Sequence, residues 1–167
     1  MSKNKWETQP RKENGEFTFR NNPEIKQYII NLLLDYYKRH PNDVSKTSKG
    51  GSYGELRKST KENHNLEIHH MPANSASPLS RWKGPCVILE KEDHALTKSF
   101  KNSKSAVRYR QVQKKLIEKG LFLEAEFLDI LDLLDKFGSK YSKAMLEKIS
   151  YDQKLQSTGE INDETEH

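Results

Sequence analysis

Two adjacent histidines and a nearby glutamate are the residues of this chain best suited to chemistry. They lie in residues 66–73, LEIHHMPA, which read as a short β-strand that a proline ends. Because side chains alternate along a strand, the two apolar residues should face a core, and Glu67 and His69 should share the opposite face. We expect the turn toward Pro72 to bring His70 back beside His69.

A third histidine completes the candidate site. His94 follows the β-like run CVILE at residues 86–90, and the order strand, loop, strand, helix can bring it under the histidine pair. Two neutral imidazoles and a carboxylate in one small volume cost solvation unless a cation or a polar network offsets the cost. We therefore expect a site for one metal ion, with His69 and His94 as ligands. His70 would then be the general base, and Glu67 would orient an imidazole or a neighbouring arginine.

Such a group suits the hydrolysis of a phosphodiester bond. Water is a weak nucleophile and an alkoxide is a poor leaving group, so a divalent ion at the phosphate and a base for the water proton both accelerate the reaction. Neutral histidine is a suitable base because its reference pKa lies near the working pH. Imidazole ligands favour Zn²⁺ or Ni²⁺, and Mg²⁺ remains an alternative where phosphate oxygens complete the shell.

Three cations near these segments are candidates for phosphate contacts. Arg81 and Lys83 lie in the loop between the two histidine-bearing segments, and Arg57 precedes the first. Contacts with phosphate position a nucleic acid without reading its sequence. We expect binding that weakens with salt and is largely indifferent to sequence.

The surrounding patterns are mostly helical. Apolar residues recur at helical spacing in residues 23–40, 106–119 and 121–137, and more weakly in 141–151. Gly138 should close the strongest of these helices, and Asp129 and Asp132 fall toward its polar side.

These patterns divide the chain into five segments. They are a flexible arm (1–20), an N-terminal helix and polar loop (21–52), the histidine-bearing core (53–103), a helical scaffold (104–156) and an acidic, disordered tail (157–167). Within the core, residues 53–57 read as a turn or a short strand, and residues 91–97 as a helix that carries His94.

The composition limits the class of protein. Of the 167 residues, 33% are hydrophobic and 32% are charged, which predicts one domain with a modest core. The net charge of +5 suits a polyanionic partner. The single cysteine, Cys86, excludes an intramolecular disulfide and a multi-cysteine zinc site, and it reads as a small buried apolar side chain. No apolar run is long enough to span a bilayer, and no signal peptide is visible.

Three short runs together resemble a known superfamily. Residues 67–72 (EIHHMP), 85–89 (PCVIL) and 93–94 (DH) look like the HNH, or His-Me finger, endonucleases, and in particular the EHHH-type nuclease domain of bacterial polymorphic toxins. The nuclease colicins carry a similar Glu-x-His-His on their first strand. The resemblance covers about residues 53–99. It implies an α+β fold in which a ββα-metal core, two strands, a loop and one helix around a single metal, is embedded in a mostly helical domain.

The resemblance also implies a role for each residue of the site. His70 corresponds to the general base, His69 to the first metal ligand, His94 to the ligand on the helix and Glu67 to the supporting carboxylate.

This chain departs from the family pattern in two places. The family often has an asparagine just before the second strand to orient the base, and this chain has Gly84-Pro85 there. Lys98 stands where colicins carry another histidine, and a protonated lysine has no lone pair for a metal. Either Glu67 or a backbone carbonyl is left to orient His70.

The function implied is metal-dependent cleavage of DNA without sequence specificity. Such domains usually form the toxic C-terminal end of a larger secreted protein, act in the cytoplasm of a target cell and are neutralised by a cognate immunity protein. One alternative is a nuclease toxin directed at RNA. Another is a non-catalytic nucleic-acid-binding module with a structural metal, although structural zinc usually has four protein ligands, often including cysteine.

Overall fold

A small antiparallel sheet packed between helices defines the architecture. The computed structural model describes residues 23–159, so the predicted arm (1–20) and most of the predicted tail (160–167) lie outside the described residues. The helices are α1 (Pro23–Arg39), α2 (Tyr53–Thr60), α3 (Lys91–His94), α4 (Lys104–Glu118), α5 (Phe122–Phe137) and α6 (Ser142–Ser157). The strands are β1 (Gly50–Ser52), β2 (Leu66–His70) and β3 (Pro85–Glu90), and short 3₁₀ turns occupy Pro41–Asp43 and Asn74–Ala76. This content confirms the predicted α+β class.

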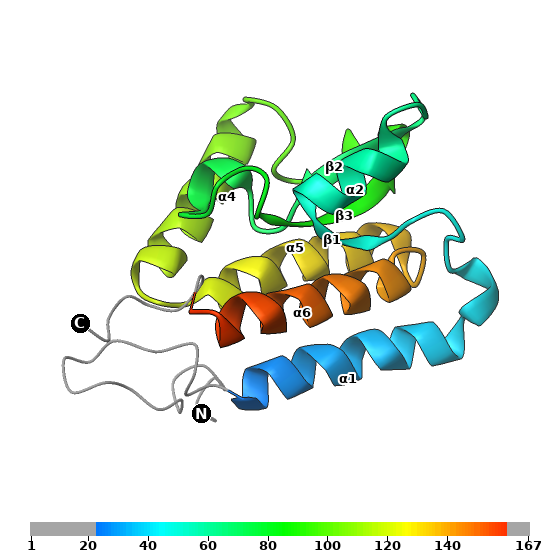
Figure 1. Cartoon of the computed structure of the whole chain (residues 1–167), viewed down its shortest axis with the longest axis horizontal. Coiled ribbons are helices and arrows are strands. Elements are labelled where there is room, and N and C mark those ends of the chain that lie inside the picture. The colour runs from blue at the N-terminus through cyan, green and yellow to red at the C-terminus, as the bar shows by residue number, and fades with distance from the viewer. Residues whose placement is uncertain (1–22, 160–167) are drawn as a thin grey trace.

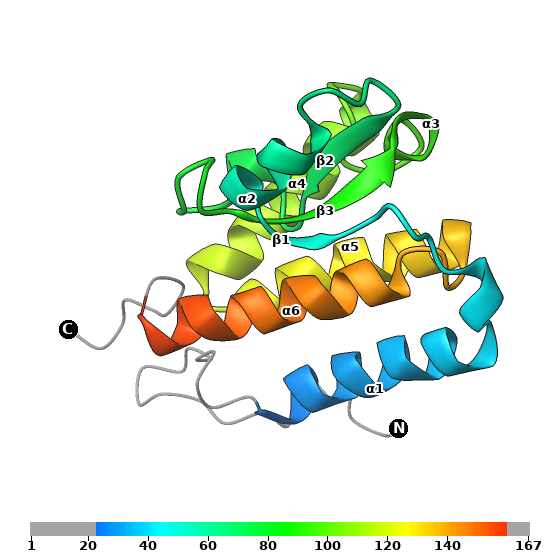
Figure 2. The ribbon, with the colours of Figure 1, turned by 45° about the vertical axis from the view of Figure 1, so that its right-hand side comes forward.

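The strands lie in the order β1-β3-β2, and both pairs are antiparallel. Figures 1 and 2 show α2 on one side of the sheet, α5 and α6 on the other, and α1 beyond them. The central strand β3 is buried on both faces, which explains its nearly continuous apolar run. Within the described sheet β2 is an edge strand, and the candidate site forms along it.

Alternation along β3 divides the apolar residues between two clusters. Val87 and Leu89 pack with α1, α5 and α6 in the larger cluster, whereas Cys86 and Ile88 pack under α2 in the smaller one. Cys86 is fully buried, and burial raises the pKa of its thiol. Its predicted role as a small buried apolar side chain is confirmed.

The predicted long helices are confirmed as α1, α4, α5 and α6. α1 turns Ile25, Ile29 and Leu33 into the core. α5 ends at Gly138, whose φ of 56° lies in the left-handed region that glycine adopts without strain. Within residues 23–159, every helix falls short of the length and apolar character that a membrane crossing requires.

Several local predictions are wrong. The segment predicted as a polar loop, 42–52, contains β1, whose residues pair with β3. Residues 53–57 begin α2 instead of forming a turn or strand, because the Ser52 hydroxyl accepts a hydrogen bond from the backbone N–H of Glu55 and caps the helix. The helix that carries His94 ends at that residue, and the last helix continues to Ser157.

Asp129 and Asp132 were expected on a polar face, but both are buried. The Tyr109 hydroxyl donates to Asp129 at 2.7 Å, and Gln113 Nε2 donates to the same carboxylate at 2.7 Å. Asp132 accepts the backbone N–H of Lys98 at 2.8 Å. Because α4 and the segment after α3 cover this side of α5, residues that look solvent-facing in the helical pattern became internal hydrogen-bond acceptors.

A buried ion triad joins α5 to α6. Lys148 Nζ lies 2.8 Å from Glu126 Oε2 and 2.9 Å from Asp152 Oδ2, and none of the three side chains is more than 3% exposed. Burial by itself lowers the pKa of Lys148, but the two carboxylates outweigh burial and raise it. The lysine therefore stays charged inside the core. Burial and the neighbouring Asp152 raise the pKa of Glu126 well above its ordinary value, and Lys148 offsets only part of that increase.

Removal of that lysine should leave carboxyl groups buried without a cation. We predict that Lys148→Met lowers the free energy of unfolding by about 3–5 kcal/mol, measured by urea denaturation. Lys143→Met, at an exposed position of the same helix, is the matched control and should cost far less. Equal urea midpoints for the two variants would contradict an energetic role for the triad.

Glu124 on α5 makes stability depend on pH. Its side chain is 7% exposed and its Oε1 atom has no hydrogen-bond partner among the described residues. Burial raises the pKa of this carboxyl from an ordinary value of 4.5 to about 7. Between these two pKa values, the folded state therefore holds a proton that the unfolded chain has already released. The resulting stabilisation is complete below the unfolded pKa and is lost as the pH rises through the folded pKa.

Glu124→Gln keeps the shape of the side chain but stays neutral at every pH. We predict that the free energy of unfolding of this variant, relative to that of wild type, increases by about 3 kcal/mol as the pH rises from roughly 4.5 to 8. Urea denaturation at several pH values measures the difference. The control is Glu118→Gln, at an exposed carboxylate of α4. Parallel pH profiles for wild type and Glu124→Gln would show the prediction to be wrong.

Candidate active site

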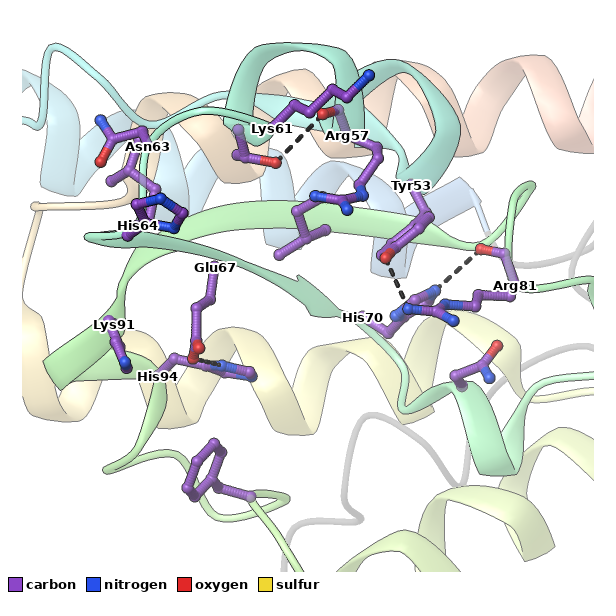
Figure 3. Close-up of a pocket in the computed structure, with 15 residues that line it drawn as sticks. Tyr53, Arg57, Lys61, Asn63, His64, Glu67, His70, Arg81, Lys91 and His94 are labelled. Carbon is purple, nitrogen blue, oxygen red and sulfur yellow. Dashed lines mark hydrogen bonds and ion pairs between the residues drawn. The ribbon is translucent and has the colours of Figure 1, made fainter.

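A pocket of about 710 Å³ lies along β2 and takes residues from both faces of that strand. Five predicted site residues line it, namely Arg57, Glu67, His70, Arg81 and His94. Figure 3 shows Glu67 and His94 at one end of the pocket and His70, Tyr53 and Arg81 at the other. The pocket is therefore the place where the structure gathers most of the residues that the sequence singled out.

β2 sends its two histidines to opposite faces of the sheet. His69 is paired in register with Val87 and His70 with Cys86, and those two partners belong to different apolar clusters. The expectation that His70 swings back beside His69 is wrong. The strand continues through His70, whose ring stacks on Tyr53 with centroids 5.1 Å apart and an interplanar angle of 16°.

His69 and His94 do come together, as expected. Their ring centroids lie 5.2 Å apart with an interplanar angle of 60°. His69 is only 3% exposed, and its Nε2 atom is buried with no hydrogen-bond partner among the described residues. Burial, with smaller contributions from His94 and His70, holds the pKa of His69 well below its usual range. His69 is thus a neutral imidazole with an unsatisfied ring nitrogen.

Glu67 orients His94. The Glu67 Oε1 atom lies 2.8 Å from His94 Nδ1, and since an ionised carboxylate only accepts, Nδ1 carries the proton. In the neutral form of His94 the lone pair is then on Nε2. The Phe100 ring packs against the same imidazole edge to face, with centroids 5.0 Å apart. A carboxylate on the second nitrogen of a histidine is the arrangement that fixes the tautomer of a metal ligand.

The short helix α3 is anchored through Asp93, the residue before His94. Its Oδ2 atom accepts the Tyr141 hydroxyl at 2.6 Å and Lys140 Nζ at 2.7 Å. Both donors lie at the start of α6 or just before it. The helical scaffold therefore sets the position of His94 relative to His69.

A backbone carbonyl orients His70. The Arg81 carbonyl oxygen lies 3.0 Å from His70 Nε2, and because a carbonyl only accepts, Nε2 carries the proton and Nδ1 keeps the lone pair. Burial lowers the pKa of His70, although the Arg81 carbonyl raises it in part. His70 is therefore a neutral imidazole with a defined tautomer. Of the two orienting groups considered for it, the carbonyl contacts His70, while Glu67 contacts His94.

Gly84 leaves the space that the His70 ring occupies. A Cβ atom at this position would lie 2.7 Å from His70 Cδ2 and 3.1 Å from its Nε2. Only a residue without a side chain lets the His70 ring pack this closely. The Gly84 carbonyl also accepts the backbone N–H of Tyr53 at 3.0 Å, which ties the loop to the start of α2.

The pocket contains two of the three cations that were predicted to contact phosphate. Arg57 and Arg81 line the pocket, whereas Lys83 does not. The Lys83 carbonyl accepts the Tyr151 hydroxyl at 2.6 Å. The Arg81 guanidinium donates to the Tyr53 hydroxyl at 2.7 Å and lies over that ring.

Sequence reasoning missed Lys61, His64 and Lys91, which also line the pocket. Lys61 lies four residues after Arg57, so prediction of helix α2 would have placed both cations on one face. His64 lies in a polar turn, and no local pattern marks it as a site residue.

The structure brings two imidazole side chains, His69 and His94, to a spacing at which both could coordinate one metal ion. Among residues 23–159, no group of three or more His, Cys, Asp or Glu side chains is arranged to hold one. The spacing of His69 and His94 nevertheless fits a shared ion, since imidazoles bound to zinc at about 2.1 Å hold their centroids roughly 5–6 Å apart. The orphaned Nε2 of His69 and the fixed tautomer of His94 fit the same chemistry. Water and phosphate oxygens would complete the shell.

Comparisons of the chain with models of known protein families, with curated proteins and with solved structures find no match.

The contact between Gly84 and His70 generates a prediction. Gly84→Ala should displace the His70 ring, break its bond to the Arg81 carbonyl and lower stability by about 1 kcal/mol. Proton–nitrogen NMR of the histidine rings should show a protonated Nε2 for His70 in wild type and exchange between tautomers in the variant. Gly54→Ala is the control, because its Cβ would approach no atom closer than 3.4 Å. Unchanged His70 signals in Gly84→Ala would contradict the assignment.

Proposed function

We propose that this chain is a metal-dependent endonuclease that hydrolyses phosphodiester bonds in DNA, with a ββα-metal core formed by β2, β3 and α3. One observation carries the proposal. The rings of His69 and His94 lie with their centroids 5.2 Å apart; His69 has an unsatisfied buried nitrogen, and Glu67 sets the tautomer of His94. Unpaired buried polar atoms are costly, and a divalent cation would satisfy both imidazoles.

His70 is the general base of the proposed reaction. The pocket takes residues from both faces of the edge strand β2, so His70 and His94 line the same cavity. The Nδ1 lone pair of His70 takes a proton from the attacking water while the Arg81 carbonyl holds Nε2–H and fixes the ring. The lowered pKa keeps the imidazole neutral before the reaction. Stacking on Tyr53 and the close approach of Gly84 prevent the ring from turning away from the pocket.

The remaining residues hold the ion and the substrate. His69 and His94 are the metal ligands, and Glu67 positions His94. The chemistry that a Mg²⁺, Zn²⁺ or Ni²⁺ ion supplies when bound there is stabilisation of charge on the phosphate and on the departing oxygen. Arg57 and Arg81 contact phosphates of the strand, joined by the further lysines of the pocket wall.

The biological setting is part of the proposal. The Glu-x-His-His pattern followed by an Asp-His supports the toxic C-terminal domain of a larger secreted antibacterial toxin, delivered into the cytoplasm of the target cell. A cognate immunity protein would neutralise it, and an acidic one would complement the net charge of +5.

Plasmid cleavage by the purified full chain tests the reaction. We predict nicking in the presence of Mg²⁺, Mn²⁺, Ni²⁺ or Zn²⁺ and no cleavage in EDTA. A structured RNA is treated in parallel, and exclusive RNA cleavage would favour the RNA-directed alternative. Cleavage that persists in EDTA would rule out the metal mechanism.

Histidine variants separate the proposed roles. His70→Ala should lower the cleavage rate about 10²–10⁴-fold while metal affinity, measured by calorimetry, stays near wild type. His69→Ala and His94→Ala should weaken metal binding itself. His40→Ala, at an exposed histidine distant in sequence from the site, is the control and should retain both properties. If wild type binds metal and nucleic acid but cleaves neither DNA nor RNA, the binding-module alternative holds.

A further inference from the structure

Trp82 places an exposed aromatic ring beside the candidate active site. Its side chain is 59% exposed, which is unusual because tryptophan side chains are highly buried on average. Among the described residues, the other exposed large apolar side chains lie on helices, except Leu96, which follows α3 and is aliphatic. Trp82 is the exposed large aromatic residue of the loop between β2 and β3. The position of this indole therefore calls for an explanation in terms of the site.

The indole is held in place by the beginning of α2. The Trp82 carbonyl accepts the backbone N–H of Gly54 at 3.1 Å. An added Cβ at Gly54 would lie 3.9 Å from Trp82 Cε3, so the six-membered ring of the indole lies close above that glycine. The Tyr53 ring meets the indole edge to face, with centroids 5.4 Å apart. Exposure of the ring is therefore a consequence of fixed geometry.

Three rings form a continuous series from the candidate base to the surface. Tyr53 stacks on His70 on one side and contacts Trp82 on the other. A single ring thus separates the indole from the imidazole. Because only the Tyr53 ring lies between them, a nucleotide whose phosphate lies at His70 can bring its own unstacked base or a neighbouring one to Trp82.

The charges around the indole point to a nucleic acid as its occupant. Trp82 lies between Arg81 and Lys83 in sequence, and all three residues are exposed. Proteins that bind single strands combine cations for the backbone with aromatic rings for the bases. An apolar protein partner would instead require a contiguous apolar patch, and the neighbours of Trp82 in this loop are cations.

We propose that Trp82 stacks on an unpaired nucleobase next to the scissile phosphate, so that the substrate is a single-stranded or locally unpaired segment of nucleic acid. This inference rests on the proposed nuclease function and assigns its substrate class. Bases in a duplex have both faces covered by their neighbours, and a base must leave the stack before an aromatic side chain can cover it.

Tryptophan fluorescence tests the stacking directly. The chain has two tryptophans, so Trp6→Phe in the full-length chain leaves Trp82 as the reporter. The protein is titrated in EDTA with a short oligothymidylate, and in parallel with a blunt-ended DNA duplex of the same length, in which every base is paired. Quenching by the single strand at low concentration, with little quenching by the duplex, is the expected result. Equal quenching by both, or by neither, overturns the proposal.

Two substitutions of the indole separate stacking from simple apolar contact. Trp82→Phe keeps a π face and should retain most of the affinity for oligothymidylate. Trp82→Leu keeps apolar volume without a ring and should weaken binding about tenfold, measured by anisotropy of a labelled strand at constant salt. Val112→Leu, also at an exposed apolar position, is the control. Equal affinity for the leucine variant and wild type overturns the proposal.

The readouts distinguish this inference from the nuclease itself. Selective quenching by the single strand without cleavage in any metal would leave the stacking site and refute the nuclease. Metal-dependent cleavage with an unperturbed Trp82 would leave the nuclease and refute the stacking site.

Discussion

The antiparallel pairing of β2 with β3 is the constraint on which the rest of the candidate site depends. The register sets His69 opposite Val87 and His70 opposite Cys86, so each histidine faces a different layer of the molecule. A shift of one residue would exchange the two faces. The buried run of β3, covered by helices on both sides, makes such a shift costly because it would move every apolar side chain of one strand away from its cluster.

On each face of the sheet, a different part of the chain positions the histidine. On the face of His69, the α5–α6 scaffold anchors Asp93 through Tyr141 and Lys140 and so brings His94 within contact. The scaffold itself contains compensated charges, the triad around Lys148 being the most buried. Polar groups of this kind destabilise a fold when one partner is missing, and their geometry restricts how the helices can pack.

The loop of residues 81–84 serves the other face. One carbonyl orients His70, another accepts the first N–H of α2, and a glycine leaves space for the imidazole. The same loop presents Arg81 and Trp82. The proposed substrate contacts and the orientation of the proposed base therefore both depend on one short segment, whose shape depends on its hydrogen bonds with α2. This explains why the segment has no helical or strand periodicity of its own.

The sequence by itself determined the long helices, the central strand and the identity of the three histidines, because periodicity and residue type are local properties. The strand β1 was not predicted because it has only three residues. Helix α2 was not predicted although Ser52 and Glu55 have the spacing of a capping box, because the polar residues around them look like a loop. Only the tertiary structure decided that Glu67 accepts a hydrogen bond from His94, that a backbone carbonyl accepts one from His70 and that two aspartates of α5 are buried. Each of these contacts joins residues that are distant in sequence, and a local sequence pattern does not indicate which distant residue will be the partner.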